Sequence, residues 1–171
     1  MSGARTLDAR TARARVEALL VARGCDFEGD GDATVIFPGE LDDATCSVTL
    51  TLDDTTLGDE DATADALSLT LAAVLPLPPV LALHRDRIDA LIGRAAPWLD
   101  YGTFEVDPDL GQVQLRYAWT LPADIGLPDA FLIAPAYEVI GSVQDWLPAF
   151  EAVLQDDATV DEAWARVHED A

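Results

Sequence analysis

A short run in the first third of the chain constrains the fold more than any other feature. Residues 45–52 alternate strictly between polar and apolar side chains. The polar positions are Thr45, Ser47, Thr49 and Thr51, and the apolar ones are Cys46, Val48, Leu50 and Leu52. Because successive side chains of a strand point to opposite faces, this alternation predicts a strand with one face in the core and one in water. Such strands are typical of antiparallel sheets.

Turn sequences predict that this strand belongs to a larger sheet. The glycine-rich turn 29–32 is flanked by the segments 25–28 and 33–37, and the turn 108–111 separates the strand-like segments 101–107 and 112–121. Both patterns are typical of hairpins. Alternating leucines predict a further strand at 67–71, and we interpret the acidic residues 53–65 before it as a polar loop.

Apolar residues at helical spacing predict three long helices and a short one. The first ends at Gly24, the second runs from Pro79 to Pro97, and the third covers 132–154. A Thr159–Glu162 capping box opens the last. The order α-β-β-β-α-β-β-α plus a short C-terminal helix predicts an α+β fold, with an antiparallel sheet of about five strands packed by helices. We expect one domain over residues 1–155 and an acidic tail helix over 156–171.

The charge of the chain limits what it can bind. There are 32 acidic residues and 10 basic ones, all Arg, which gives a net charge of −22. Five of the Arg lie in residues 1–23, so that segment carries +3 and the remainder −25. A negative field of this size repels nucleic acid and anionic membranes and attracts basic proteins. We therefore predict no direct nucleic-acid binding and no membrane span, and expect a basic protein partner, which could itself bind nucleic acid.

Candidate sites for small ligands are weak. The run Asp26, Glu28, Asp30, Gly31 and Asp32 resembles the start of a calcium loop, but Phe37 stands where the twelfth position needs Glu. His84 and His168 have no nucleophile or metal-ligand partner at an informative spacing, and the two cysteines, Cys25 and Cys46, form no redox or metal pattern. We predict no catalytic residues, no cofactor and no metal, and two reduced thiols in a cytoplasmic protein.

The acidic cluster and the tryptophans are the candidate partner-binding residues. The cluster consists of Asp53, Asp54, Asp59, Glu60, Asp61 and Asp65. Trp98, Trp119 and Trp146 lie on periodic faces and are predicted in the core, whereas Trp164 either docks on its own subunit or anchors a partner.

The element order and the segment 102–117, which reads GTFEVDPDLGQVQLRY, resemble the YbjN-like family, whose fold is that of type III secretion chaperones. The resemblance covers residues 7–155. It implies a homodimer that acts as a protein-binding or regulatory module without an enzyme's active site. The Arg-rich first helix and the tail after Gln155 depart from a dedicated secretion chaperone.

These observations predict a dimeric, chaperone-like protein that binds basic proteins. The broad apolar stripe of the central helix suggests the dimer interface. Its candidate residues are Val80, Leu81, His84, Ile88, Leu91, Ile92 and Ala95. One alternative is an acidic regulator that mimics nucleic acid and blocks a DNA-binding protein. The other is an enzyme that depends on carboxylates or a metal.

Overall fold

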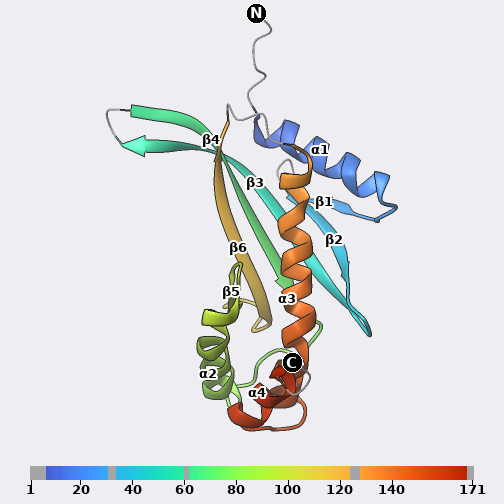
Figure 1. Cartoon of the computed structure of the whole chain (residues 1–171), viewed down its shortest axis with the longest axis vertical. Coiled ribbons are helices and arrows are strands. Elements are labelled where there is room, and N and C mark those ends of the chain that lie inside the picture. Colours follow the sequence, from blue (N-terminus) through green and yellow to red (C-terminus); the bar gives the residue numbers. More distant parts are fainter. Residues whose placement is uncertain (1–6, 31–33, 60–61, 124–127, 169–171) are drawn as a thin grey trace, which may run out of the picture.

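The strands form one open antiparallel sheet (Figure 1). The computed structural model describes residues 7–30, 34–59, 62–123 and 128–168. Its strands are β1 (Glu28–Asp30), β2 (Thr34–Glu40), β3 (Thr45–Asp59), β4 (Ala62–Val74), β5 (Thr103–Val106) and β6 (Val113–Pro122). They lie in the order β1-β2-β3-β4-β6-β5, and every neighbouring pair is antiparallel. The predicted α+β fold is confirmed, with four strands rather than three before the central helix.

Helices cover one face of this sheet. α1 (Ala9–Ala22) and the long α3 (Ala130–Leu154) pack on it, while α2 (Arg85–Ala95), the short η1 (Ala96–Trp98) and α4 (Val160–His168) gather at one end (Figure 1). Val48 and Leu50 point to the helices and are buried, whereas Thr49 on the opposite face is partly exposed. The alternation in the sequence therefore predicted correctly which face of β3 is in the core and which is toward solvent.

Gly39 sets the distance between α3 and the sheet. A Cβ at this position would lie 2.6 Å from Cys46 Sγ and 2.8 Å from Ile140 Cγ1. Since both atoms belong to packed side chains, only glycine lets the helix approach β2 so closely.

The acidic segment predicted as a loop is a two-stranded arm. β2 follows β3 only as far as Thr51, and β6 follows β4 only from Ala66, but β3 and β4 remain paired out to Asp59 and Ala62. The pair projects past the sheet (Figure 1). The loop prediction is wrong because 53–59 contains β-forming Thr and Leu residues, which continue the ladder among the carboxylates.

The central helix is shorter than predicted. It begins at Arg85, because the preceding segment is held by a contact outside the helix: Val80 N donates to Gly111 O at 2.7 Å, in the turn before β6. His84 N then donates to Leu81 O at 2.9 Å, which closes a single turn before the helix.

The apolar stripe of α2 faces its own chain. Ile88, Leu91 and Ala95 are buried within the single subunit. The expectation that these three form a dimer interface is therefore corrected, since a side chain already in the core cannot also meet a second copy. Val80 and Ile92 are half-buried, and Leu81 is 58% exposed. His84 is nearly buried, and its Nδ1 lies 3.0 Å from an Arg87 guanidinium nitrogen.

The C-terminal helix docks on its own subunit through aromatic residues. The Trp164 ring lies 5.5 Å from that of Trp146 and 5.8 Å from that of Trp98, with the Arg94 guanidinium 4.2 Å above it. Trp98 is 64% exposed, so its predicted place in the core is wrong, because it packs on α4 from outside.

The predicted capping box of α4 is confirmed. Glu162 accepts from Thr159 N at 2.8 Å, and Glu162 N donates to Thr159 Oγ1 at 3.3 Å. These bonds from Thr159 hold the pKa of Glu162 below its usual value. Asp157, just before the helix, has a lowered pKa because the Arg87 guanidinium binds it.

Candidate protein-binding groove

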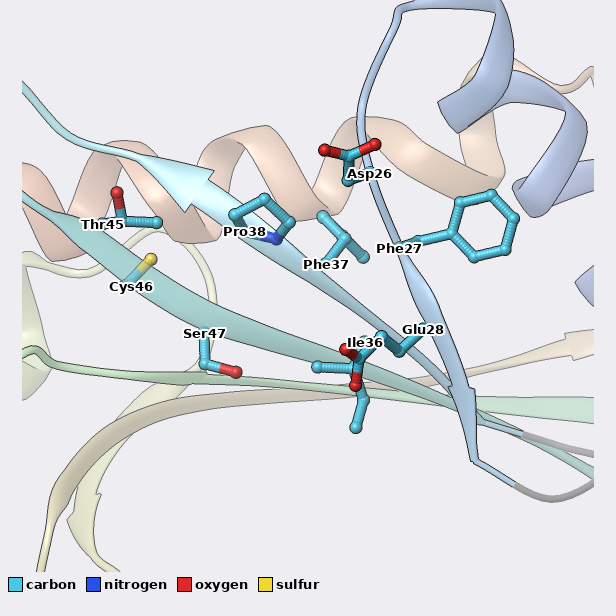
Figure 2. A pocket seen from close by; sticks show the side chains of 9 residues that line it. All are labelled: Asp26, Phe27, Glu28, Ile36, Phe37, Pro38, Thr45, Cys46 and Ser47. Carbon is cyan, nitrogen blue, oxygen red and sulfur yellow. The ribbon is translucent and has the colours of Figure 1, made fainter.

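The outer edge of β2 is flanked by two cavities. β1 pairs only with Thr34–Ile36, so among the described residues Phe37–Glu40 has no strand on the side away from β3. The chain at Asp26 and Phe27 leads into β1 across this edge (Figure 2). One cavity of about 420 Å³ and another of about 460 Å³ lie beside this crossing and share Asp26, Phe37 and Pro38. We call the two together the β2 groove.

The floor of the β2 groove is largely apolar. Figure 2 shows the side chains of the first cavity, which come from the entry to β1, from β2 and from the start of β3. The second cavity opens between α1, β2 and α3. Its apolar lining residues are Leu20, Phe37, Pro38, Ile133, Ala136 and Ile140. Cavities of this size with apolar walls are typical of binding sites.

Carboxylates surround this floor. Asp26 and Glu28 line the first cavity, Asp26 and Glu40 line the second, and all three side chains are exposed. Among the described lining residues, Arg23 is the one basic side chain, and its guanidinium carbon lies 5.8 Å from the centre of the Tyr137 ring. The rim therefore combines an excess of negative charge with an apolar interior.

The groove contains two free thiols, of which Cys46 is poorly suited to act as a nucleophile. Cys46 is buried, and this burial raises the pKa of its thiol, so the sulfur is protonated at neutral pH. Cys25 is partly exposed and, like Cys46, is a free thiol. The arrangement favours binding of a segment that is apolar and basic over covalent chemistry.

The predicted partner-binding residues lie elsewhere. Asp53 and Asp54 lie on β3 where β6 still flanks β4, and Asp59 at the end of β3 and Asp65 on β4 lie on the arm. Glu60 and Asp61 fall outside the described residues. Asp54 has a structural role, since its Oδ1 accepts from Ala9 N at 2.8 Å at the start of α1.

The calcium-like run is partly within the groove. Asp26 and Glu28 line it and Asp30 ends β1, but Gly31 and Asp32 fall outside the described residues. In the described part of the chain no three His, Cys, Asp or Glu side chains converge as a metal site. The helices described there include none long and apolar enough to cross a membrane.

Sequence reasoning missed the β2 groove because its walls are far apart in the chain. α1, β2 and α3 meet only in the folded state. One local signal was present: Pro38 lies inside a strand, and proline within a sheet is confined to edges, where its missing N–H is not needed.

Comparisons with protein-family models and with curated proteins find no match for this chain.

Proposed function

We propose that this chain is a non-enzymatic, homodimeric, chaperone-like or regulatory protein of the cytoplasm that binds basic proteins. One observation carries the proposal: an apolar-floored groove at the β2 edge, rimmed by Asp26, Glu28 and Glu40, in a chain of net charge −22. The resemblance of the sequence to YbjN-like proteins with the secretion chaperone fold supports it.

The charge and the groove act at different stages of binding. A field of this sign increases the encounter rate with a basic partner by roughly 10-fold or more at low salt and repels free nucleic acid. The apolar floor then slows dissociation, because it removes apolar partner side chains from water. A partner that itself binds nucleic acid suits this surface, since such proteins present basic patches.

Neutralising the groove rim should slow association with a basic probe. We expect the triple variant Asp26→Asn, Glu28→Gln, Glu40→Gln to bind a fluorescently labelled peptide of alternating Arg and Leu with an association rate lower by about 3- to 10-fold at low salt. Each exposed carboxylate contributes no more than about 1 kcal/mol to the affinity. Stopped-flow anisotropy measures the rate.

A matched control separates the rim from the overall charge. The variant Asp100→Asn, Asp109→Asn, Asp145→Asn removes the same total charge from exposed positions that do not line the groove. With both triple variants compared at about 0.15 M salt, where the Debye length is about 8 Å, the control should slow association less than the rim variant does. Equal effects of the two triple variants would argue against the groove as the binding site.

The nucleic-acid mimic is the second candidate, and the projecting arm favours it, because each of its two strands carries a carboxylate, Asp59 on β3 and Asp65 on β4. Salt distinguishes the two functions. A mimic should lose nearly all affinity for its partner at about 0.5 M salt, while a groove binder keeps the apolar part. Capture of partners from the source organism, washed at both salt levels and identified by mass spectrometry, tests this. Binding of the pure protein to DNA at physiological salt contradicts both functions.

A further inference from the structure

Half of β6 is an unpaired sheet edge. β5 pairs with β6 only from Val113 to Arg116. Just before β5, Gly102 has a φ of +78° and still lies against Arg116, since a Cβ added to it would be 2.6 Å from the Arg116 backbone oxygen. Beyond Arg116, no strand among the described residues lies on this side of β6, so Tyr117–Pro122 forms the edge. We call this segment the β6 edge.

The register shows which backbone groups point outward. Leu75 N donates to Val113 O at 3.0 Å and Ala123 N donates to Asp65 O at 2.9 Å, so the odd-numbered residues of β6 direct their N–H and C=O groups toward β4. Because this direction alternates along an antiparallel strand, Ala118 and Thr120 direct theirs to the open edge.

An aromatic groove lies beside this edge. A cavity of about 320 Å³ runs between the β6 edge and the first turns of α3. The Tyr117 and Trp119 rings stack at 5.0 Å, Tyr101 meets Tyr117 at 5.5 Å, and Phe131 on the α3 side is 60% exposed. Exposed aromatic surface of this kind is concentrated at protein interfaces.

Among the described residues, the stretch of the β6 edge beyond Tyr117 shows none of the usual features that prevent strand pairing. Proteins protect such edges with charged side chains, internal prolines, bulges or covering segments. The sequence here is Tyr-Ala-Trp-Thr-Leu-Pro, with no charge and with proline only at the end. Its pairing to β4 is continuous from Val74↔Gln114 to Ala66↔Pro122, without a bulge.

We propose that the β6 edge pairs antiparallel with the β6 edge of a second copy of this chain, about a two-fold axis. This places Ala118 opposite Thr120 of the partner subunit, so that the outward N–H and C=O groups of both are satisfied reciprocally. The two sheets become one, and the α3 helices of the two copies cover the aromatic grooves. The inference rests on the homodimer of the proposed function and moves its interface from α2 to β6.

Charge selects a second copy over a basic segment as the occupant. Two chains of −22 repel each other, and the repulsion is least where neither surface carries carboxylates. The β6 edge is such a surface, with Glu138 the one charged side chain among the described groove residues, exposed on α3. A basic partner gains nothing from an uncharged strand and is better matched by the carboxylate rim of the β2 groove.

Two variants test this pairing without disturbing the core. Ala118→Pro removes an N–H that the single subunit does not use, and Thr120→Lys places a charge on an exposed edge position. Sedimentation should show the wild type as a dimer of 18.3 kDa chains. Both variants should weaken the dimer by about 100-fold or more, because several backbone bonds and the apolar contact are lost together. Circular dichroism should show unchanged secondary structure.

The control places the same charge on the same sheet face away from the edge: Thr49→Lys, on the central strand β3, should leave the dimer intact. A wild type that is monomeric overturns the inference. It is also overturned if both edge variants remain dimeric while the double variant Leu81→Asp, Leu83→Asp becomes monomeric. Binding of the Arg-Leu peptide to the β2 groove is measured separately from the oligomeric state. Absence of peptide binding by the wild type contradicts the proposed groove binding, whereas a wild type that binds the peptide as a monomer contradicts the dimer and its β6 pairing but not the groove.

Discussion

Replacing Leu91 with Asp should unfold the protein rather than dissociate a dimer. Leu91 is 0% exposed within the single subunit, where it packs in the core with Ile88. A carboxylate there loses its hydration without gaining a partner, so we expect the free energy of unfolding to fall by about 4 kcal/mol or more. Urea unfolding followed by circular dichroism measures the change.

Leu83→Asp is the matched control. Leu83 lies just before α2 and is 66% exposed, so the same substitution should change the stability by less than about 0.5 kcal/mol. If Leu91→Asp instead remained folded and only halved the mass in solution, Leu91 would belong to an interface and the packing of α2 described above would be wrong.

Gly102→Ala should also destabilise strongly, for two reasons that act together. The φ of +78° is unfavourable for any side chain, and a Cβ would lie 2.6 Å from the backbone oxygen of Arg116. Backbone strain costs about 1–2 kcal/mol, and relieving the contact requires the β5–β6 hairpin to shift, so we expect a total loss of about 3 kcal/mol. Thermal and urea unfolding give the value.

Two other glycines separate these causes. Gly111 has a φ of +69° but only Pro79 Cβ near its added Cβ, at 3.6 Å, so Gly111→Ala should cost only the strain, about 1 kcal/mol. Gly93 lies inside α2 with open space around it, so Gly93→Ala should stabilise by up to about 1 kcal/mol. Equal losses at Gly102 and Gly111 would show that the contact with Arg116 contributes nothing.

Local sequence patterns predicted the elements well where a single regular spacing of polar and apolar residues, or a capping pair, was clear. The Thr and Leu alternation at 45–52 identified a strand and its buried face, and the Thr159–Glu162 spacing identified a helix start. The arm was missed because the density of Asp in 53–65 outweighed the β-forming residues among them. The start of α2 was predicted too early, because a single long-range bond, Val80 N to Gly111 O, holds the preceding segment outside the helix, and no local signal reports such a bond.

The surfaces were harder to predict than the elements. Trp98 and Trp164 were both periodic and aromatic, yet which of them is exposed depends on how α4 lies against α2. The β2 groove and the β6 edge depend on where the outer neighbouring strands stop: beyond β1, Phe37 pairs only with β3, and beyond β5, Tyr117 pairs only with β4. Hydrophobic periodicity predicts that a strand exists but not which residue of its neighbour is the last to pair.

The strand order has a consequence for how the chain folds. β1 to β4 form a meander of consecutive hairpins, and β5 with β6 form another hairpin, so four of the five strand pairings join sequence neighbours. The pairing of β4 with β6 is the exception among the described strands, since it must close the loop that contains α2. The entropy cost of closing this loop must be met before the contacts between β4 and β6 can stabilise the chain. We therefore expect the pairing of β4 with β6 to limit the folding rate. Leu69→Ala, in β4 opposite Trp119, should slow folding more than Val35→Ala in β2 does. Stopped-flow refolding measures both rates.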